Sequence, residues 1–230
     1  YQWNTKCYSL VQSMVAQVAQ PVLVSLNGEQ GRQIDVFRKM MRFTSFITFP
    51  LMFGFGLVAK EFIVIAIGEK WLASAELIQI LCVSGATMPL ATLFSNMIIS
   101  KGRSGTFFWC TFSLGLVQIV TMLLIWRWGI RSMVIAYMLI NTSWLMVWLF
   151  FVRRLTGYGY WRFFCDVMPF ALAAAGVMAV SYVATLSLSN LWALLLSRFV
   201  IAALLYYIVM KVARVKILKE CERFLFKRKR

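Results

Sequence analysis

A stripe of amide and hydroxyl side chains runs along the first apolar segment of the chain, residues 7–26, which carries no charge. At 100° per residue, the stripe falls within about 140° of a helical wheel. Its members are Ser9, Gln12, Ser13, Ala16, Gln17 and Gln20. Such groups hydrogen-bond a polar solute or a neighbouring helix, because lipid tails offer them no partner. Three glutamines on one face favour the wall of a hydrated substrate cavity over helix–helix contact.

Four other residues are candidates for binding an anion. Asn96 ends an apolar segment, and Lys101 and Arg103 follow it, so the three could meet an anionic lipid headgroup. Ordinary anchoring of a span by basic residues explains Lys101 and Arg103 equally well. Arg198 lies deep in an apolar segment, where its guanidinium could hold a pyrophosphate. We expect it instead to reach along the helix to the nearest membrane interface.

The acidic residues indicate no buried proton relay. All eight acidic residues, Asp166 among them, lie outside the uncharged cores of the apolar segments. Glu61, Glu69 and Glu76 cluster near one expected mouth and could bind a cation or contact sugars. We expect them to be solvated helix ends, with Lys60 and Glu61 near a membrane face.

Enzyme chemistry has no visible basis in this sequence. There is no histidine, the five cysteines are scattered without metal-binding spacing, and no phosphate-binding glycine loop occurs. The sequence therefore predicts no catalytic residue, no metal site, no cofactor and no enzyme.

Composition indicates the elements that position these candidates. With 61% hydrophobic residues and no long polar stretch, the chain is predicted to be an all-α, polytopic transmembrane bundle. The seven predicted spans are 7–26, 43–68, 77–100, 104–126, 132–152, 167–188 and 191–210. They form a single membrane domain over residues 1–230. Residues 27–42 are predicted to form a separate amphipathic helix in the interface, and 211–230 a basic cytoplasmic tail.

The basic residues set the expected orientation. One set of alternating loops and the C-terminal tail holds eighteen of them, against five in the other set. By the positive-inside tendency, the first set and the C-terminus are cytoplasmic. The net charge of +16 is thus explained by topology and lipid headgroups, and we expect no nucleic-acid partner.

Several motifs in one order carry a family resemblance. The pattern FPL…G…AKEF…IGEKWLASAELIQIL, with YQWNTKCYSL before it and NMIISKGRS after it, resembles bacterial flippases for O-antigen and related polysaccharide units. These belong to the polysaccharide transporter family of the multidrug/oligosaccharidyl-lipid/polysaccharide transporter superfamily. The similarity is strongest from Tyr1 to about Gly105. It implies the C-terminal portion of a longer protein, namely the second lobe of a two-lobed flippase plus two C-terminal helices.

The resemblance also implies a function. A flippase of this family, in the bacterial inner membrane, would move polyprenyl-pyrophosphate-linked oligosaccharide units of lipopolysaccharide or other surface polysaccharides across the bilayer. Membrane lipids and other polysaccharide-assembly proteins would be its partners. A drug exporter of the same superfamily is the alternative transporter. A membrane polymerase or transferase is the alternative enzyme, which the short outer loops and the missing histidine disfavour.

Overall fold

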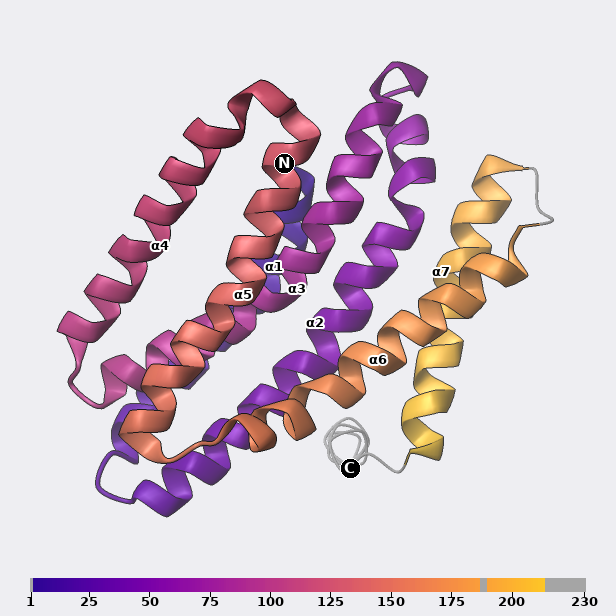
Figure 1. The fold of residues 1–230 in the computed structure, drawn as a ribbon. Helices are drawn as coiled ribbons and strands as arrows, with labels where there is room; N and C mark the ends of the chain where they lie inside the picture. Colours follow the sequence, from indigo (N-terminus) through magenta and orange to yellow (C-terminus); the bar gives the residue numbers. More distant parts are fainter. Residues whose placement is uncertain (1, 187–189, 214–230) are drawn as a thin grey trace.

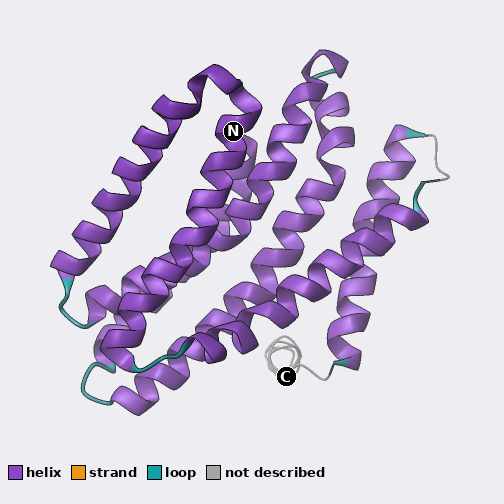
Figure 2. Cartoon of the chain, in the orientation of Figure 1, coloured by secondary structure: helices purple, strands orange, loops and turns teal. Residues whose placement is uncertain are grey.

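The chain folds into a bundle of long helices, and a computed structural model describes residues 2–186 and 190–213 of it. The helices in these ranges are α1 (Gln2–Ser25), α2 (Gln30–Ala66), α3 (Leu72–Ser100), α4 (Ser104–Ile125), α5 (Ile130–Thr156), α6 (Tyr160–Ala184) and α7 (Leu191–Val212). Short 3-10 turns at Glu69–Trp71 and Trp126–Trp128 lead into α3 and α5. The described ranges contain helices and short loops without a strand (Figure 2), which confirms the all-α class.

Six of these helices are long and apolar enough to cross a membrane, within the residues described. They correspond to α2 through α7, so six of the seven predicted spans meet this criterion. The first segment contributes a shorter apolar stretch, Val15–Ser25, inside α1.

Different helices form the two edges of the bundle in the view of Figure 1. The view places α4 at one edge and α7 at the opposite edge, with α2 and α3 between them and α6 running obliquely from the lower middle of the view to α7. Helix α3 contacts α1, α2 and α5 and is the most buried, whereas α4 touches chiefly α5 and leaves most of its surface exposed. The hairpin of α6 and α7 joins the remaining helices mainly through α2.

Helix α2 corrects the prediction of a separate interfacial helix over 27–42. It runs without interruption through 37 residues, about 56 Å at the usual rise, so it exceeds a hydrocarbon core of about 30 Å. The apolar side of its first turns faces protein: Phe37 and Met41 are fully buried. The Phe37 ring lies 5.8 Å from that of Phe94 and 5.5 Å from that of Tyr158. Packing against these rings explains the amphipathic pattern.

Buried Gln33 ties three helix ends together. Its Nε2 donates to the Leu23 carbonyl at 2.6 Å and to the Ser100 Oγ at 3.3 Å. The Leu23 carbonyl belongs to the last turn of α1, where no further helical N–H is available to it. The side chain therefore caps α1 and joins it to the start of α2 and the end of α3.

Two predicted boundaries matter for the sites described below. Helix α6 begins at Tyr160, seven residues before the predicted start at Val167, so Asp166 lies inside it. Its predicted end at Leu188 lies outside the described residues. Of the predicted tail 211–230, Lys211 and Val212 belong to α7, and residues 214–230 lie outside the described ranges.

Candidate functional site

The glutamine stripe of α1 divides into two parts in the structure. Gln12 is half-buried, and its Nε2 donates to the Thr92 Oγ1 of α3 at 3.0 Å. Gln12 therefore acts as a contact between helices. Ser13, Gln17 and Gln20 are exposed. Their assignment to a hydrated cavity stays a prediction, now restricted to these three residues.

The predicted anion-binding group at the end of α3 is not gathered at one surface. Asn96 is only 6% exposed and its Nδ2 has no hydrogen-bond partner. Lys101 follows the end of α3 and is partly exposed, and Arg103, just before α4, is exposed. The two basic residues can meet a headgroup, whereas Asn96 lies within the protein.

Arg198 does not reach the interface, and that expectation was wrong. The residue is 6% exposed, and its Nη1 donates to the Glu61 Oε1 at 2.6 Å. Its Nη1 also lies 3.2 Å from the Leu57 carbonyl, its Nε donates to the Thr185 Oγ1 at 3.1 Å, and the guanidinium lies over the Tyr182 ring. Reaching for water would break all of these contacts, so the arginine stays inside.

The expectation that Glu61 is a solvated helix end was also wrong. Glu61 is 8% exposed, because α2 continues as a helix to Ala66 and turns this side chain toward α7. Neighbouring Lys60 is exposed. Glu69 and Glu76 are both exposed, as expected for helix ends. A buried charge at this position was detectable only by pairing it with Arg198, which is 137 residues away in the chain.

A second buried carboxylate, Asp166, was missed by the sequence analysis. It is fully buried and accepts hydrogen bonds from two arginines of α2. Arg38 approaches both carboxylate oxygens, at 2.9 and 3.1 Å, and the Arg42 Nε lies 2.6 Å from Oδ1. The one available signal was the spacing of Arg38 and Arg42, four residues apart on one helix face.

Tyr158 completes this network from the short connection between α5 and α6. Gly157 ends α5 in a left-handed conformation (φ +77°), which suits glycine and turns the chain inward. The fully buried Tyr158 hydroxyl then donates to the Asp166 Oδ2 at 3.0 Å. Burial raises the pKa of the Tyr158 phenol, and the nearby carboxylate raises it further, so the phenol stays neutral and donates.

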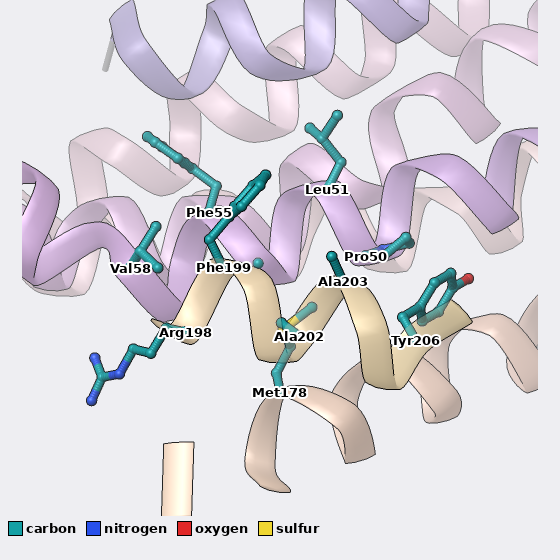
Figure 3. A pocket seen from close by; sticks show the side chains of 11 residues that line it. Pro50, Leu51, Phe55, Val58, Met178, Arg198, Phe199, Ala202, Ala203 and Tyr206 are labelled. Atoms are coloured by element: carbon teal, nitrogen blue, oxygen red, sulfur yellow. The ribbon is translucent and has the colours of Figure 1, made fainter. Parts of the chain in front are cut away.

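A groove of about 470 Å³ lies between α2 and α7 (Figure 3). Apolar side chains line most of it, and the small residues Gly54, Ala202 and Ala203 leave the space open. Arg198 stands at one end and Tyr206 at the other. In Figure 3 the guanidinium points away from the apolar lining residues, consistent with its contacts to Glu61 and Thr185.

Tyr206 contacts α2 where a proline interrupts its backbone hydrogen bonds. Pro50 has no N–H, so the Phe46 carbonyl four residues earlier lacks its helical donor. The Tyr206 hydroxyl donates to that carbonyl at 2.9 Å. The link replaces the missing hydrogen bond and attaches α7 to the middle of α2.

Comparison with known proteins locates the similarity in the first part of the chain. Residues 1–76 match the family described as "Polysaccharide biosynthesis protein". An uncharacterized membrane protein in the cps region of Klebsiella pneumoniae is 28% identical over 95 residues, covering 41% of this chain and 20% of that protein. The teichuronic acid biosynthesis protein TuaB of Bacillus subtilis is 28% identical over 100 residues, covering 43% of this chain and 21% of TuaB.

A third relative is the lipopolysaccharide biosynthesis protein WzxC of Escherichia coli, 23% identical over 90 residues, covering 39% of this chain and 18% of WzxC. The chain thus matches about a fifth of the length of each of these relatives. No solved structure matches it significantly. The matched region contains α1 and α2, with the polar face of α1, Arg38, Arg42 and Glu61. Through residues 1–76, this multi-pass membrane chain is related to the polysaccharide biosynthesis protein family.

Proposed function

We propose that this chain is part of a flippase that moves lipid-linked oligosaccharide units across the bacterial inner membrane, with its C-terminus in the cytoplasm. The observation that carries the proposal is the family match over residues 1–76, which includes the exposed polar face of α1. The substrate class is a polyprenyl-pyrophosphate-linked oligosaccharide.

The physical argument concerns the cost of crossing. A pyrophosphate and several sugars cannot pass through about 30 Å of hydrocarbon unassisted, because their polar groups would lose all hydrogen-bond partners. Ser13, Gln17 and Gln20 offer hydroxyl and amide groups on one exposed helix face. Such a face lowers the barrier by replacing water at the sugars while the other helices meet lipid.

Deleting the gene tests the transport step. Loss of a flippase leaves the lipid-linked intermediate built but trapped in the inner leaflet, and surface polysaccharide falls while sugar-transfer activities persist. Unpolymerised units that accumulate in the outer leaflet would contradict the proposal and indicate a polymerase. Unchanged polysaccharide with increased sensitivity to small toxic compounds would contradict it in favour of a drug exporter.

A variant pair tests the polar face itself. Gln17→Leu with Gln20→Leu should reduce export severalfold without loss of membrane insertion, because leucine favours a span. Val18, exposed on another side of α1, provides the matched control, since Val18→Leu leaves the polar face intact. Normal export by the double glutamine variant, measured as surface polysaccharide at equal protein level, would exclude this face from the substrate path.

A further inference from the structure

Two polar connections hold α7 to α2, and the groove lies between them. Arg198 forms one, through Glu61 and the Leu57 carbonyl, and Tyr206 forms the other, through the Phe46 carbonyl. The two residues are eight positions apart, which is about 12 Å along a helix. Both stand at the groove between α2 and α7.

The groove limits how strongly apolar packing can hold these two helices together. A helix pair in a membrane associates through close van der Waals contact, since lipid is as apolar as the side chains. The space of about 470 Å³ around Gly54, Ala202 and Ala203 removes part of that contact. The polar connections therefore carry a larger share of the attachment of α7 than they would across a packed interface.

The connection through Arg198 is the one whose two charged side chains can reach water once they separate. Glu61 lies five residues before the end of α2, and Arg198 lies seven residues after the start of α7. Both are within about 10 Å of a helix end, so after separation each side chain can extend to water at the interface. The Glu61 Oε2 has no hydrogen-bond partner in the paired state. The carboxylate is thus incompletely satisfied while it is paired with the arginine.

The Tyr206 connection lacks this freedom. Its acceptor, the Phe46 carbonyl, has lost its helical donor to Pro50, and a backbone carbonyl cannot extend to water as a long charged side chain can. Breaking it would leave a carbonyl and a hydroxyl without partners. The end of α7 near Arg198 is therefore the end that can move.

We propose that Glu61 and Arg198 form a releasable latch, which closes the start of α7 onto α2 and whose separation lets α7 pivot about Tyr206 and widen the groove. The latch is a property of the helix packing and holds whether or not the chain transports an oligosaccharide. In the latched state α7 is attached at both ends of the groove. In the released state the Tyr206 hydrogen bond is the one of these two polar connections to α2 that remains.

Hydrogen–deuterium exchange of the protein in lipid nanodiscs tests the latch. Arg198→Leu leaves Glu61 without its cation, so peptides from the first half of α7 should exchange about tenfold faster or more, while α3 is unchanged. Glu61→Gln keeps an acceptor for Arg198 without the charge, and it should give a smaller change in the same peptides. It also serves if the arginine variant does not fold. Equal exchange in α7 of the wild type and both variants would overturn the proposal, as would an equal increase in α3 and α7.

A doubly apolar variant separates the loss of the latch from the effect of an unpaired buried charge. Glu61→Leu with Arg198→Leu removes both halves of the latch and leaves no unpaired charge, so exchange in the first half of α7 should stay faster than in the wild type. The exposed pair Arg131–Glu76 is the matched control, and Arg131→Leu should leave α7 unchanged. Exchange in the double variant at the wild-type rate would show that only the unpaired charge of the single variant disturbs α7, and would overturn the proposal.

Discussion

The two ends of the contact between α2 and the α6–α7 hairpin are both held by buried carboxylates, but in different ways. At one end, Asp166 receives two arginines and a tyrosine, and both of its oxygens are hydrogen-bonded. At the other end, Glu61 meets a single arginine, and one of its oxygens has no partner. Among the described residues, the first carboxylate is fully satisfied and the second is not.

The arginines at the two ends also differ in how far their side chains are exposed to water. The side chains of Arg38 and Arg42 are 29% and 41% exposed, so they reach water while they hold Asp166. Arg198 is nearly fully buried. A buried carboxylate with several donors is a stable anchor. In a single buried ion pair, the attraction between the charges compensates less of the free energy that desolvation costs. The comparison assigns the anchor to Asp166 and the movable connection to Glu61.

Removing both cations at the anchor should have the largest effect. In Arg38→Met with Arg42→Met, Asp166 stays buried with only Tyr158 as a donor, so unfolding free energy should fall by about 3–5 kcal/mol. Denaturant titration in mixed micelles measures this. Asp166→Asn provides the comparison, because the two arginines that it leaves are partly exposed and can turn to water. Its loss of unfolding free energy should therefore be smaller than that of the double arginine variant. Equal stability of the double arginine variant and the wild type would remove the distinction between the two ends.

An intermediate effect is expected at the pivot. Tyr206→Phe removes the donor to the Phe46 carbonyl next to Pro50, and a carbonyl without a partner in the bundle costs about 1–3 kcal/mol. The same micelle titration applies, with Leu204→Ile at an exposed position of α7 as the control. A loss no larger than that of the control would mean that lipid or backbone rearrangement replaces the hydrogen bond.

The smallest effect should come from an exposed pair. Arg131 and Glu76 lie 3.9 Å apart with side chains 72% and 52% exposed, so Glu76→Gln should change unfolding free energy by less than about 0.5 kcal/mol. A cost similar to that of the buried networks would show that burial is not what separates these ion pairs.

The amino-acid sequence determined the class of this protein and the approximate place of its helices. Long uncharged segments must form helices in a membrane, because lipid leaves every backbone group to be satisfied within the segment. For the same reason the four prolines did not end helices, and those at positions 21, 50, 89 and 169 all lie inside them. The motifs near the N-terminus also sufficed to predict the relation to polysaccharide biosynthesis proteins.

The neighbours of each helix face were decided only by the tertiary structure. Helices α3 and α4 are both strongly apolar, yet α3 lies in the centre and α4 at an edge. Composition cannot distinguish them, because a protein interior and a lipid tail are equally suitable for leucine or phenylalanine. The glutamine stripe on α1 was visible in the sequence, but the partner that separates Gln12 from Gln17 and Gln20 is Thr92, on another helix.

The buried charges show the same limit most clearly. Glu61 and Asp166 look like ordinary charges near the ends of apolar segments, whereas Arg198 lies deep in one without a visible partner. Each is stable inside the bundle only because a partner on a distant helix is brought within hydrogen-bonding distance. A sequence records which charges exist, whereas the free energy of burying one depends on the partner it meets, and that partner is fixed by how the helices pack.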